Sequence, residues 1–344
     1  MDRLRYWQHL GAGGLVVISL SLASFAQKDR NQIPVNRDEE PIKLRTTLVQ
    51  VPVTVSSPGG RYVTDLLQSD FSIFEDGVKQ RIEFFGSVEE PFSVALLLDS
   101  SGSTAAQVDQ IKSAALAFVD SMRTRDRAMV ISFNDSVQVQ CDLTGDRETL
   151  KRAVVSVAPG EFTQVYEAVY TAVWERLQEI KGRKAVILFS DGIDTASSEI
   201  AAEDTLDAVI ESEDIVIYPI RYSTRADVEA KVEPRIRSSL GSKGNDVVLN
   251  EIARTQREID RTYRKADEYL NQLAEMSGGI LERADTLQDL QGAFTRIADE
   301  LRRQYLLGYY PTNREKDARD RKIRVDVSRP GVQVRARPAY RASQ

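Results

Sequence analysis

The sequence is poor in the two residue types that most often form cross-links or ligate transition metals. It contains one cysteine and one histidine in 344 residues. Cys141 has no partner for an internal disulfide, and its place in the stretch VQVQC predicts a small buried residue. His9 lies in an N-terminal segment that we expect to be removed. The mature chain would then have no imidazole for Ser-His-Asp or Cys-His catalysis or for histidine-ligated zinc.

Long apolar runs are also scarce, and the one that stands out is near the N-terminus. It follows Arg3 and Arg5 and precedes the small-x-small sequence Ser24-Phe25-Ala26. This pattern is typical of a secretory signal peptide over residues 1–26, with an uncleaved anchor as the alternative. We therefore expect a secreted or periplasmic protein without a transmembrane segment after cleavage. The net charge of -6 argues against nucleic acid as a partner.

The pattern of apolar residues divides the remaining chain into segments. Residues 27–43 are polar and predict a linker. Two segments, 44–90 and 306–344, show the alternation of half-buried strands. Turn sequences interrupt both, Asp76-Gly77 in the first and Arg329-Pro330-Gly331 in the second, where we expect Val332 and Val334 to close a hairpin. Because neither segment has enough strands to bury its apolar face alone, we predict that they join in one small antiparallel β domain.

Residues 91–305 have a different pattern, with continuous apolar runs separated by helical periodicity. The runs are SVALLLD, RAMVISF, KAVILFS and DIVIYPI. Strands buried on both faces predict a parallel α/β sheet covered by helices. Thr104 and Gln107 are spaced as a capping box before a helix that starts near Val108. Further helices are expected over Arg147–Val157, Gln164–Glu179, Ile200–Ser212 and Leu287–Arg303.

An insertion at about residues 222–278 is longer than an α/β connection needs. Its second half predicts a long helix with a narrow apolar seam. Such a seam either packs against the domain or pairs with another copy of the chain, and we favour the monomer. The seam consists of Leu249, Ile252, Ile259, Tyr263, Ala266, Leu270 and Leu273, with Gln256 at the polar position.

Polar residues gather where the buried runs end. Asp99, Ser101 and Ser103 follow the first run, Asp191 follows KAVILFS, and Thr163 precedes a helix. The carboxyl ends of parallel strands form the ligand edge of an open sheet. Carboxylate and hydroxyl oxygens suit Mg²⁺, Mn²⁺ or Ca²⁺ better than zinc or copper. Taken singly, Ser103 or Thr163 is better explained as a helix N-cap, and Asp191-Gly192 can be explained as a turn. Together they predict a divalent-cation site.

The order Asp-x-Ser-x-Ser, threonine, strand-end aspartate resembles the metal-ion-dependent adhesion site of von Willebrand factor A domains, including the integrin inserted domain. The resemblance places that site at Asp99, Ser101, Ser103, Thr163 and Asp191. It implies a doubly wound, mostly parallel, Rossmann-like sheet with Val137–Asp142 as an antiparallel edge strand. The flanking sequences DFSIFEDGVKQRIEFF, QYLLGYYPTN and VRARPAYR resemble secreted von Willebrand A-related proteins typical of acidobacteria.

Three classes of function follow from this site. Two carboxylates leave a cation short of anionic ligands, so an Asp or Glu carboxylate from a protein partner can replace a water on the ion, as the resemblance also implies. The first class is therefore a binding and adhesion module that is not an enzyme. The second is a haloacid dehalogenase-like phosphotransferase with Asp99 as nucleophile, although such a site needs an aspartate where Ser101 stands. The third is a structural assembly subunit, whose mark would be a degraded motif. We assign Asp194 to a cap or a supporting position.

Overall fold

The structure is a computed structural model that describes residues 48–86, 88, 90–104, 107–212, 214–240, 244–315 and 317–342. All of them belong to one compact unit. The predicted signal peptide (1–26) and linker (27–43) lie outside the described residues. In the described part of the chain, no helix has the length and hydropathy needed to cross a membrane.

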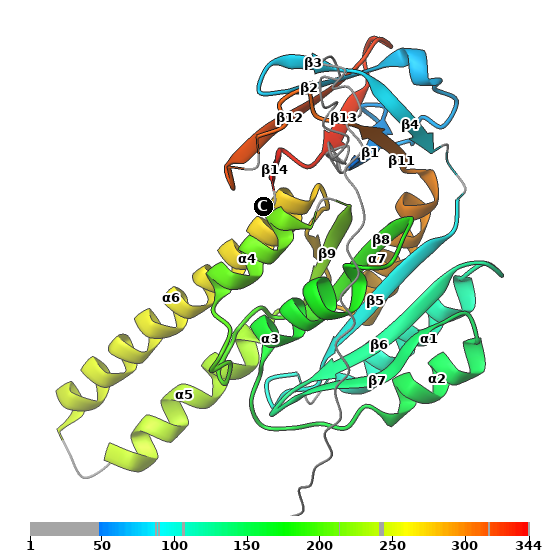
Figure 1. The fold of residues 1–344 in the computed structure, drawn as a ribbon. Coiled ribbons are helices and arrows are strands. Elements are labelled where there is room, and N and C mark those ends of the chain that lie inside the picture. The colour runs from blue at the N-terminus through cyan, green and yellow to red at the C-terminus, as the bar shows by residue number, and fades with distance from the viewer. Residues whose placement is uncertain are drawn as a thin grey trace, which may run out of the picture. The chain divides into compact units, whose positions relative to one another are not determined.

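A six-stranded sheet with the order β10-β9-β8-β5-β6-β7 forms the centre of the fold (Figure 1). All neighbouring strands pair in parallel except β7, which pairs antiparallel with β6 at the edge. This confirms the predicted doubly wound α/β fold and its antiparallel edge strand. The strands are β5 (Phe92–Asp99), β6 (Arg127–Phe133), β7 (Val137–Thr144), β8 (Arg183–Ser190), β9 (Ile215–Arg221) and β10 (Glu282–Arg283).

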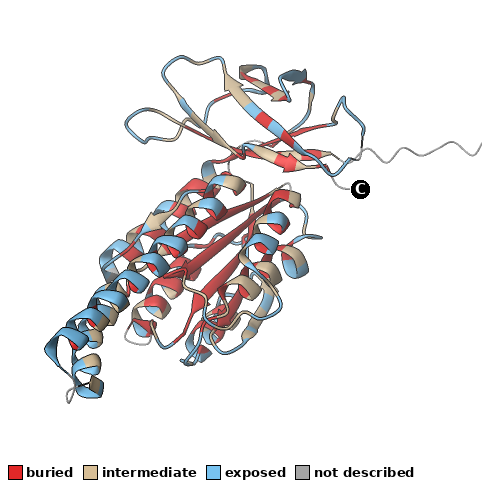
Figure 2. Ribbon diagram, turned by 90° about the vertical axis from the view of Figure 1, so that its left-hand side faces the viewer, coloured by how far each residue is buried: buried red, intermediate tan, exposed pale blue. Residues whose placement is uncertain are grey.

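Helices cover both faces of this sheet, so its central strands are buried throughout (Figure 2). One face carries α1 (Val108–Ser121), α2 (Arg147–Ser156) and α7 (Leu287–Arg303). The other face carries α3 (Val165–Tyr170), the π-helical turn η2 (Thr171–Leu177), α4 (Ala202–Glu211) and the end of α6 (Asn245–Ser277). These helices lie where the sequence predicts them.

The predicted capping box at the start of α1 is wrong. The N-cap residue of α1 is Gln107, and its side chain makes no capping hydrogen bond. The Thr104 hydroxyl instead donates to the backbone oxygens of Asp99 and Ser101, at 3.3 and 3.1 Å. Thr104 therefore holds the loop after β5 together rather than starting the helix.

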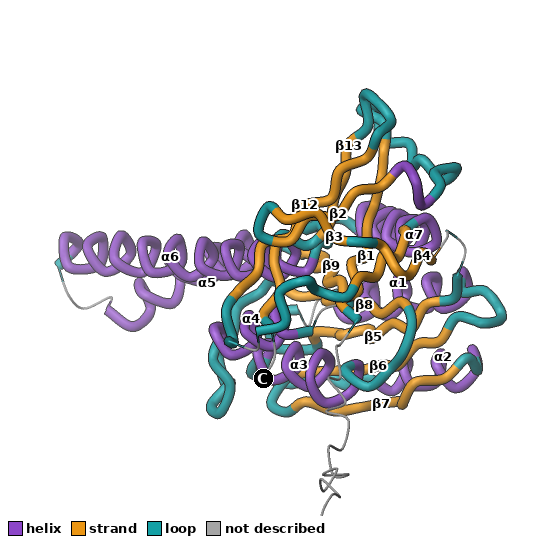
Figure 3. Tube along the Cα trace, turned by 45° about the horizontal axis from the view of Figure 1, so that its top comes forward, coloured by secondary structure: helices purple, strands orange, loops and turns teal. Residues whose placement is uncertain are grey.

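The insertion forms a helical hairpin of α5 (Arg225–Leu240) and α6, and α6 extends well beyond the sheet (Figure 3). The predicted long helix is confirmed, and the apolar residues of its seam from Ile252 to Leu273 are buried, while Gln256 is exposed. The first seam position is wrong: Leu249 is 47% exposed, while Val248 is buried. The buried stripe of α6 contacts α4, α5 and β9 of its own chain.

The two flanking segments form two four-stranded sheets around a shared apolar core, as predicted. One sheet has the order β13-β1-β11-β4 and the other β14-β12-β2-β3. The expected hairpin around Gly331 is wrong, because β13 pairs with β1 while β12 pairs with β2 and β14. The strands are β1 (Val49–Ser56), β2 (Phe71–Glu75), β3 (Val78–Gln80), β4 (Ile82–Gly86), β11 (Tyr305–Tyr309), β12 (Asp320–Val327), β13 (Gln333–Ala336) and β14 (Ala339–Arg341).

Buried polar contacts join these β sheets to the α/β domain. The Glu300 carboxylate of α7 accepts hydrogen bonds from Thr54 at 3.3 Å and from Tyr218 at 2.7 Å, and forms an ion pair with Arg335. The Arg337 guanidinium donates to three backbone oxygens at the end of α4. Tyr218 belongs to the α/β domain itself, whereas Thr54, Arg335 and Arg337 come from the flanking segments that form the β sheets. Because Thr54 and Arg337 are buried, separating the two parts would leave their polar groups without these partners.

Candidate metal centre

The predicted site lies at the switch point of the sheet. From β5 the chain continues to β6 on one side, and later returns to β8 on the other side. Such a reversal leaves a crevice at the carboxyl ends of the two adjacent strands, where open α/β sheets bind ligands. Asp99 is the last residue of β5, and Asp191 directly follows β8. The strand order therefore brings these two aspartates together although they are far apart in sequence.

The loop after β5 arranges the first three predicted ligands. The Ser101 amide donates to Asp99 Oδ1 at 3.0 Å, and the Ser101 and Ser103 hydroxyl oxygens lie 3.1 Å apart. Gly102 lies between them, where a Cβ atom would approach the backbone oxygen of Glu161 to 3.0 Å. Glycine thus allows this loop to lie directly against the loop that carries Thr163.

Backbone hydrogen bonds tie the two loops together and bring Thr163 to the same edge. The Gly160 amide donates to the Ser100 oxygen at 2.8 Å, and the Gly102 amide to the Glu161 oxygen at 3.3 Å. Thr163 is 3% exposed and precedes α3, whose N-cap residue is Gln164. Neither Ser103 nor Thr163 is the N-cap residue of a helix, which removes the simplest structural explanation of both hydroxyls.

Asp191 is held by a turn and by a residue of a third strand end. Its Oδ1 accepts the Ile193 amide at 3.0 Å, so the turn expected at Asp191-Gly192 is present. Its Oδ2 accepts the Thr224 hydroxyl at 2.7 Å. The Thr224 hydroxyl also lies 2.7 Å from the hydroxyl of Tyr263 on α6. A turn alone would hold only one carboxylate oxygen of Asp191. Here both oxygens accept hydrogen bonds from protein groups, so the orientation of the carboxylate is fixed.

The electrostatics of the site favour a bound cation. Asp99 and Asp191 are each 1% exposed, and neither forms an ion pair with a lysine or arginine of the described residues. Burial, and the nearby Asp191 carboxylate, raise the pKa of Asp99 to about 7 despite hydrogen bonds from Ser101 and Ser190. Burial likewise raises the pKa of Asp191. Arg221 lowers the pKa of Asp191 only weakly, since its ion pair is with Asp267. Two buried like charges without a directly paired cation are costly, and a divalent cation would remove that cost.

The donor set fits Mg²⁺, Mn²⁺ or Ca²⁺. It consists of two carboxylates and three hydroxyls, all hard oxygen ligands, and Mg²⁺ commonly keeps water where the protein supplies few ligands. The described residues contain no group of three or more histidine, cysteine, aspartate or glutamate side chains of the kind that encloses a metal completely. A cation held here would therefore rely on water or on an external ligand.

The family of this domain follows from comparison with known proteins. Residues 94–193, which run from β5 through Asp191, match the family model described as the von Willebrand factor type A domain. This part of the chain is a von Willebrand factor type A domain. No curated protein matches the chain.

Several solved structures resemble the fold of this A domain. The vWF domain of the type V pili tip protein Mfa5 from Porphyromonas gingivalis is 13% identical, with a TM-score of 0.43, over 62% of this chain and 95% of that one. A von Willebrand factor type A protein from Catenulispora acidiphila is 11% identical, with a TM-score of 0.45, over 79% of this chain and 72% of that one. Proximal thread matrix protein 1 from the mussel byssus was solved with a zinc-occupied metal-ion-dependent adhesion site (MIDAS) motif. It is 14% identical, with a TM-score of 0.44, over 64% of this chain and 48% of that one. The chain thus spans about half of the mussel protein.

Three residues around the site of the A domain were not predicted from the sequence. Ser190 donates to Asp99 Oδ2 at 2.7 Å, and Thr224 and Tyr263 support Asp191 as described. Ser190 ends β8, and Thr224 follows β9, so both lie at the carboxyl edge that carries the proposed ligands. Their position at strand ends could have identified Ser190 and Thr224 from the sequence. Tyr263, by contrast, was placed in the seam, and nothing in the sequence connects it with a strand end.

Asp194 takes the supporting role that was expected. Its Oδ2 accepts the Tyr166 amide in the first turn of α3 at 3.2 Å, and its Oδ1 accepts the Ser197 amide at 2.9 Å.

Cys141 is only partly buried, contrary to the expectation of a fully buried residue, and packs against the core beside α2.

A cavity of about 310 Å³ opens beside the metal centre of the A domain. Ser103 and Thr163 line it on the side of the site, and residues of α5 and α6 form the opposite wall. The helical insertion thus lies next to the candidate centre. The other lining residues are Glu161, Ile193, Thr195, Val228, Thr255, Glu258, Ile259, Thr262 and Tyr263.

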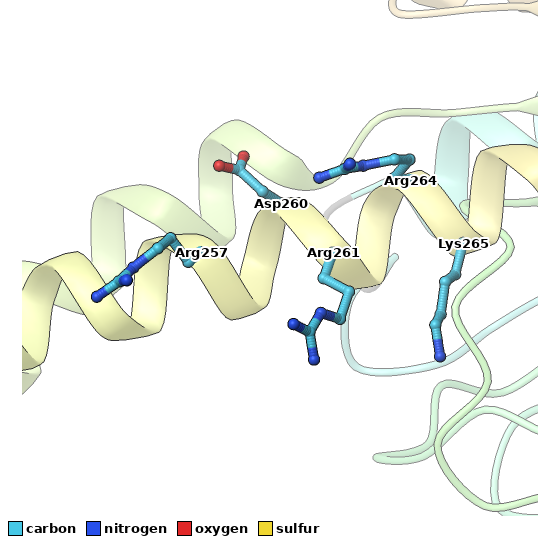
Figure 4. A pocket seen from close by; sticks show the side chains of 5 residues that line it. All are labelled: Arg257, Asp260, Arg261, Arg264 and Lys265. Carbon is cyan, nitrogen blue, oxygen red and sulfur yellow. The ribbon is translucent and has the colours of Figure 1, made fainter.

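The surface of α6 that faces away from this cavity is basic, whereas the wall of the cavity carries Glu258. A shallow hollow there is lined by four cations and one carboxylate: Arg257, Arg261, Arg264, Lys265 and Asp260. Figure 4 shows Arg261 and Lys265 leaving the helix on one side and Asp260 and Arg264 on the other. Asp260 forms an ion pair with Arg225 of α5. The helix therefore has a basic outer surface and, toward the metal centre, a surface that carries Glu258.

Proposed function

We propose that this protein binds a protein partner through a divalent cation held by Asp99, Ser101, Ser103, Thr163 and Asp191. The observation that carries the proposal is the buried pair Asp99 and Asp191, which forms no ion pair with a lysine or arginine of the described residues and accepts hydrogen bonds from the hydroxyls of Ser190 and Thr224. Mg²⁺ is the ion we propose, with Mn²⁺ or Ca²⁺ able to replace it. The match of residues 94–193 to the von Willebrand factor type A family model supports this proposal.

The partner completes the coordination of the ion. The site offers two anionic ligands, and an Asp or Glu carboxylate of the partner would replace a bound water. The hydroxyls of Ser101 and Ser103 are neutral donors, so they leave the ion with enough positive charge to attract that carboxylate. The direct cation–carboxylate contact would account for most of the dependence of binding on the metal.

We propose that the protein performs this binding without catalysing a reaction. A phosphotransferase that used Asp99 as nucleophile would need a general acid near the leaving group, and position 101 holds a serine. Thr224 and Tyr263 approach Asp191, but neither phenol nor hydroxyl is poised to donate a proton near neutral pH, since burial raises the pKa of Tyr263. The alternative of a purely structural subunit is disfavoured by the intact set of five residues.

We further propose that the protein acts outside the cytoplasm and as a monomer. The signal peptide predicted over residues 1–26 supports export. The seam of α6 supports the monomer, because Ile259 and Tyr263 are buried against the same chain while Arg257 and Arg261 lie outside. A second copy would therefore meet a charged surface rather than an apolar one.

A capture experiment tests the proposed function. The mature protein and Asp99→Ala are immobilised and exposed to native extracellular or periplasmic protein, with Mg²⁺ or with EDTA. We expect retention of a partner by the unsubstituted protein with Mg²⁺, and loss of that partner with EDTA or with Asp99→Ala. Retention of the same proteins under all conditions would contradict the proposal.

A further inference from the structure

The cavity beside the metal centre is lined by both apolar residues and glutamates, a composition that favours a long cationic side chain. Its walls include the apolar groups Ile193, Val228 and Ile259. Glu161 lies on the side of the metal-site loops and Glu258 on α6. Apolar walls together with two exposed glutamates suit a long side chain that has an aliphatic stem and a cationic end, which describes lysine and arginine. At about 310 Å³, the cavity is at the lower end of ligand sites and suits a side chain better than a cofactor.

The two glutamates are available for such a partner. Both are exposed, and Glu161 forms no ion pair with any residue that the structure describes. Glu258 has only a 4.0 Å contact with Arg254, which lies closer to Glu251, at 2.6 Å. The cations of the outer surface of α6, such as Arg261, do not line the cavity. The cavity is therefore acidic although much of α6 is basic.

The wall formed by α6 is fixed to the metal centre. Tyr263 lines the cavity, and its hydroxyl lies 2.7 Å from the Thr224 hydroxyl that donates to Asp191. Gly192 packs against Leu270 and Ala266 of the same helix, so closely that a Cβ atom would lie 2.9 Å from the Leu270 side chain. Ser103 and Thr163 belong both to the cavity and to the proposed ligand set. A partner side chain in this cavity would thus be adjacent to whatever contacts the ion.

From these observations we propose that the α5–α6 insertion selects partners in which the metal-binding carboxylate has a lysine or arginine close to it in sequence or in space. The carboxylate binds the ion, and the cationic side chain enters the cavity between Glu161 and Glu258. This inference rests on the proposed function, since the carboxylate must bind the cation first. The recognition element is a polypeptide segment with both charges, rather than an acidic segment alone.

Blocked synthetic peptides test this selection. A set of peptides places one lysine at different distances before and after a single aspartate. Matched peptides carry norleucine, which keeps the aliphatic stem and removes the charge, or asparagine in place of the aspartate. Binding is followed by NMR titration of the mature protein in Mg²⁺. We expect the best lysine peptide to bind about fivefold more tightly than its norleucine match, the upper end of the range for exposed ion pairs.

Matched variants connect the preference with the cavity. The double variant Glu161→Gln with Glu258→Gln should reduce the ratio of lysine to norleucine affinity to about one, while Mg²⁺ binding by calorimetry stays unchanged. The control Arg261→Gln with Arg264→Gln alters the outer surface of α6 and should keep the preference. Equal affinity for the lysine and norleucine peptides, or a preference that survives in the glutamate double variant, would overturn the inference. Equal affinity for the aspartate and asparagine peptides would instead overturn the proposed function on which it rests.

Discussion

The Thr224 hydroxyl donates a 2.7 Å hydrogen bond to Asp191 Oδ2, and both residues are 1% exposed. Thr224 stands between β9 and α5, so this contact links the candidate metal centre to the base of the helical insertion. The Tyr263 hydroxyl, 2.7 Å from Thr224, continues the link into α6. The orientation of one proposed ligand therefore depends on how the insertion packs.

Removing the Thr224 hydroxyl should weaken cation binding. In Thr224→Val, Asp191 loses a donor that stabilises its charged form and fixes its orientation. Groups that support metal ligands in this way typically contribute about tenfold or more to metal affinity. Calorimetric titration with Mg²⁺ measures the effect. An unchanged affinity in a folded Thr224→Val protein would show that this hydrogen bond does not support the centre.

The Tyr263 hydroxyl should contribute through Thr224, and α6 offers a matched control. Tyr263→Phe should lower Mg²⁺ affinity by less than Thr224→Val does, because it removes only the outer hydroxyl of the chain. Tyr269→Phe removes a hydroxyl in a similar buried pair, 2.9 Å from Thr205, but away from the site. It should leave Mg²⁺ affinity unchanged. Equal effects of the two substitutions would point to general loosening of α6.

The raised pKa of Asp99 predicts how stability without metal depends on pH. The pKa in the folded state is about 7, above the value of about 3.9 expected in the unfolded chain. The folded state thus holds this proton more tightly, and the resulting stability is fully present below about pH 3.9 and is lost progressively as the pH rises to about 7. In EDTA, wild type should melt at a lower temperature than Asp99→Asn at about pH 8.5, and the difference should be smaller at about pH 5.

Addition of Mg²⁺ should reverse that order at the higher pH, because the ionised Asp99 binds the ion and the asparagine has no charge. Thermal melts of both proteins at both pH values, with and without Mg²⁺, provide the comparison. If Asp99→Asn gains as much from Mg²⁺ as wild type does, the stabilising ion is bound elsewhere.

Gly192 should not tolerate a side chain because it packs directly against Leu270 of α6, whereas Gly182 has open space around it. Both residues have positive φ, 77° and 91°, but only Gly192 lies against α6. Gly182→Ala should cost ~1 kcal/mol in the free energy of unfolding, from backbone strain alone. Gly192→Ala should cost about 3 kcal/mol, since it adds overlap with Leu270, and should also weaken Mg²⁺ binding. Urea unfolding of the two variants separates strain from overlap, and equal losses would contradict the close packing of α6 here.

Arg337 should be important for stability. Its guanidinium donates to the backbone oxygens of Val209, Ile210 and Ser212 at the end of α4. Arg337→Met would leave buried carbonyls without donors and should lower the free energy of unfolding by about 3 kcal/mol. The control Arg324→Met removes an arginine that is 60% exposed and should change it by less than about 0.5 kcal/mol. Similar urea midpoints for the two variants would contradict this role.

The parts of the fold predicted correctly are those that local patterns determine. Continuous apolar runs identify strands buried on both faces, and the strand ends locate Asp99 and Asp191 at one edge. The pairing of β13 with β1 was missed because turn residues indicate where the chain reverses, and not which distant strand it then joins. The capping box failed because Thr104 found nearer acceptors in its own loop. The contact between Tyr263 and Thr224 depends on the packing of the insertion, which no local pattern encodes.

Isothermal titration of the mature, metal-free protein with Mg²⁺ tests the central claim most directly, with Asp99→Ala and Asp191→Ala titrated beside it. We expect one ion bound per wild-type chain and no detectable binding by either variant, while circular dichroism shows that both keep the fold, whose core lies in the apolar strands and helices. Equal Mg²⁺ binding by wild type and the two variants, or none by any of them, would contradict a metal centre at the junction of β5 and β8.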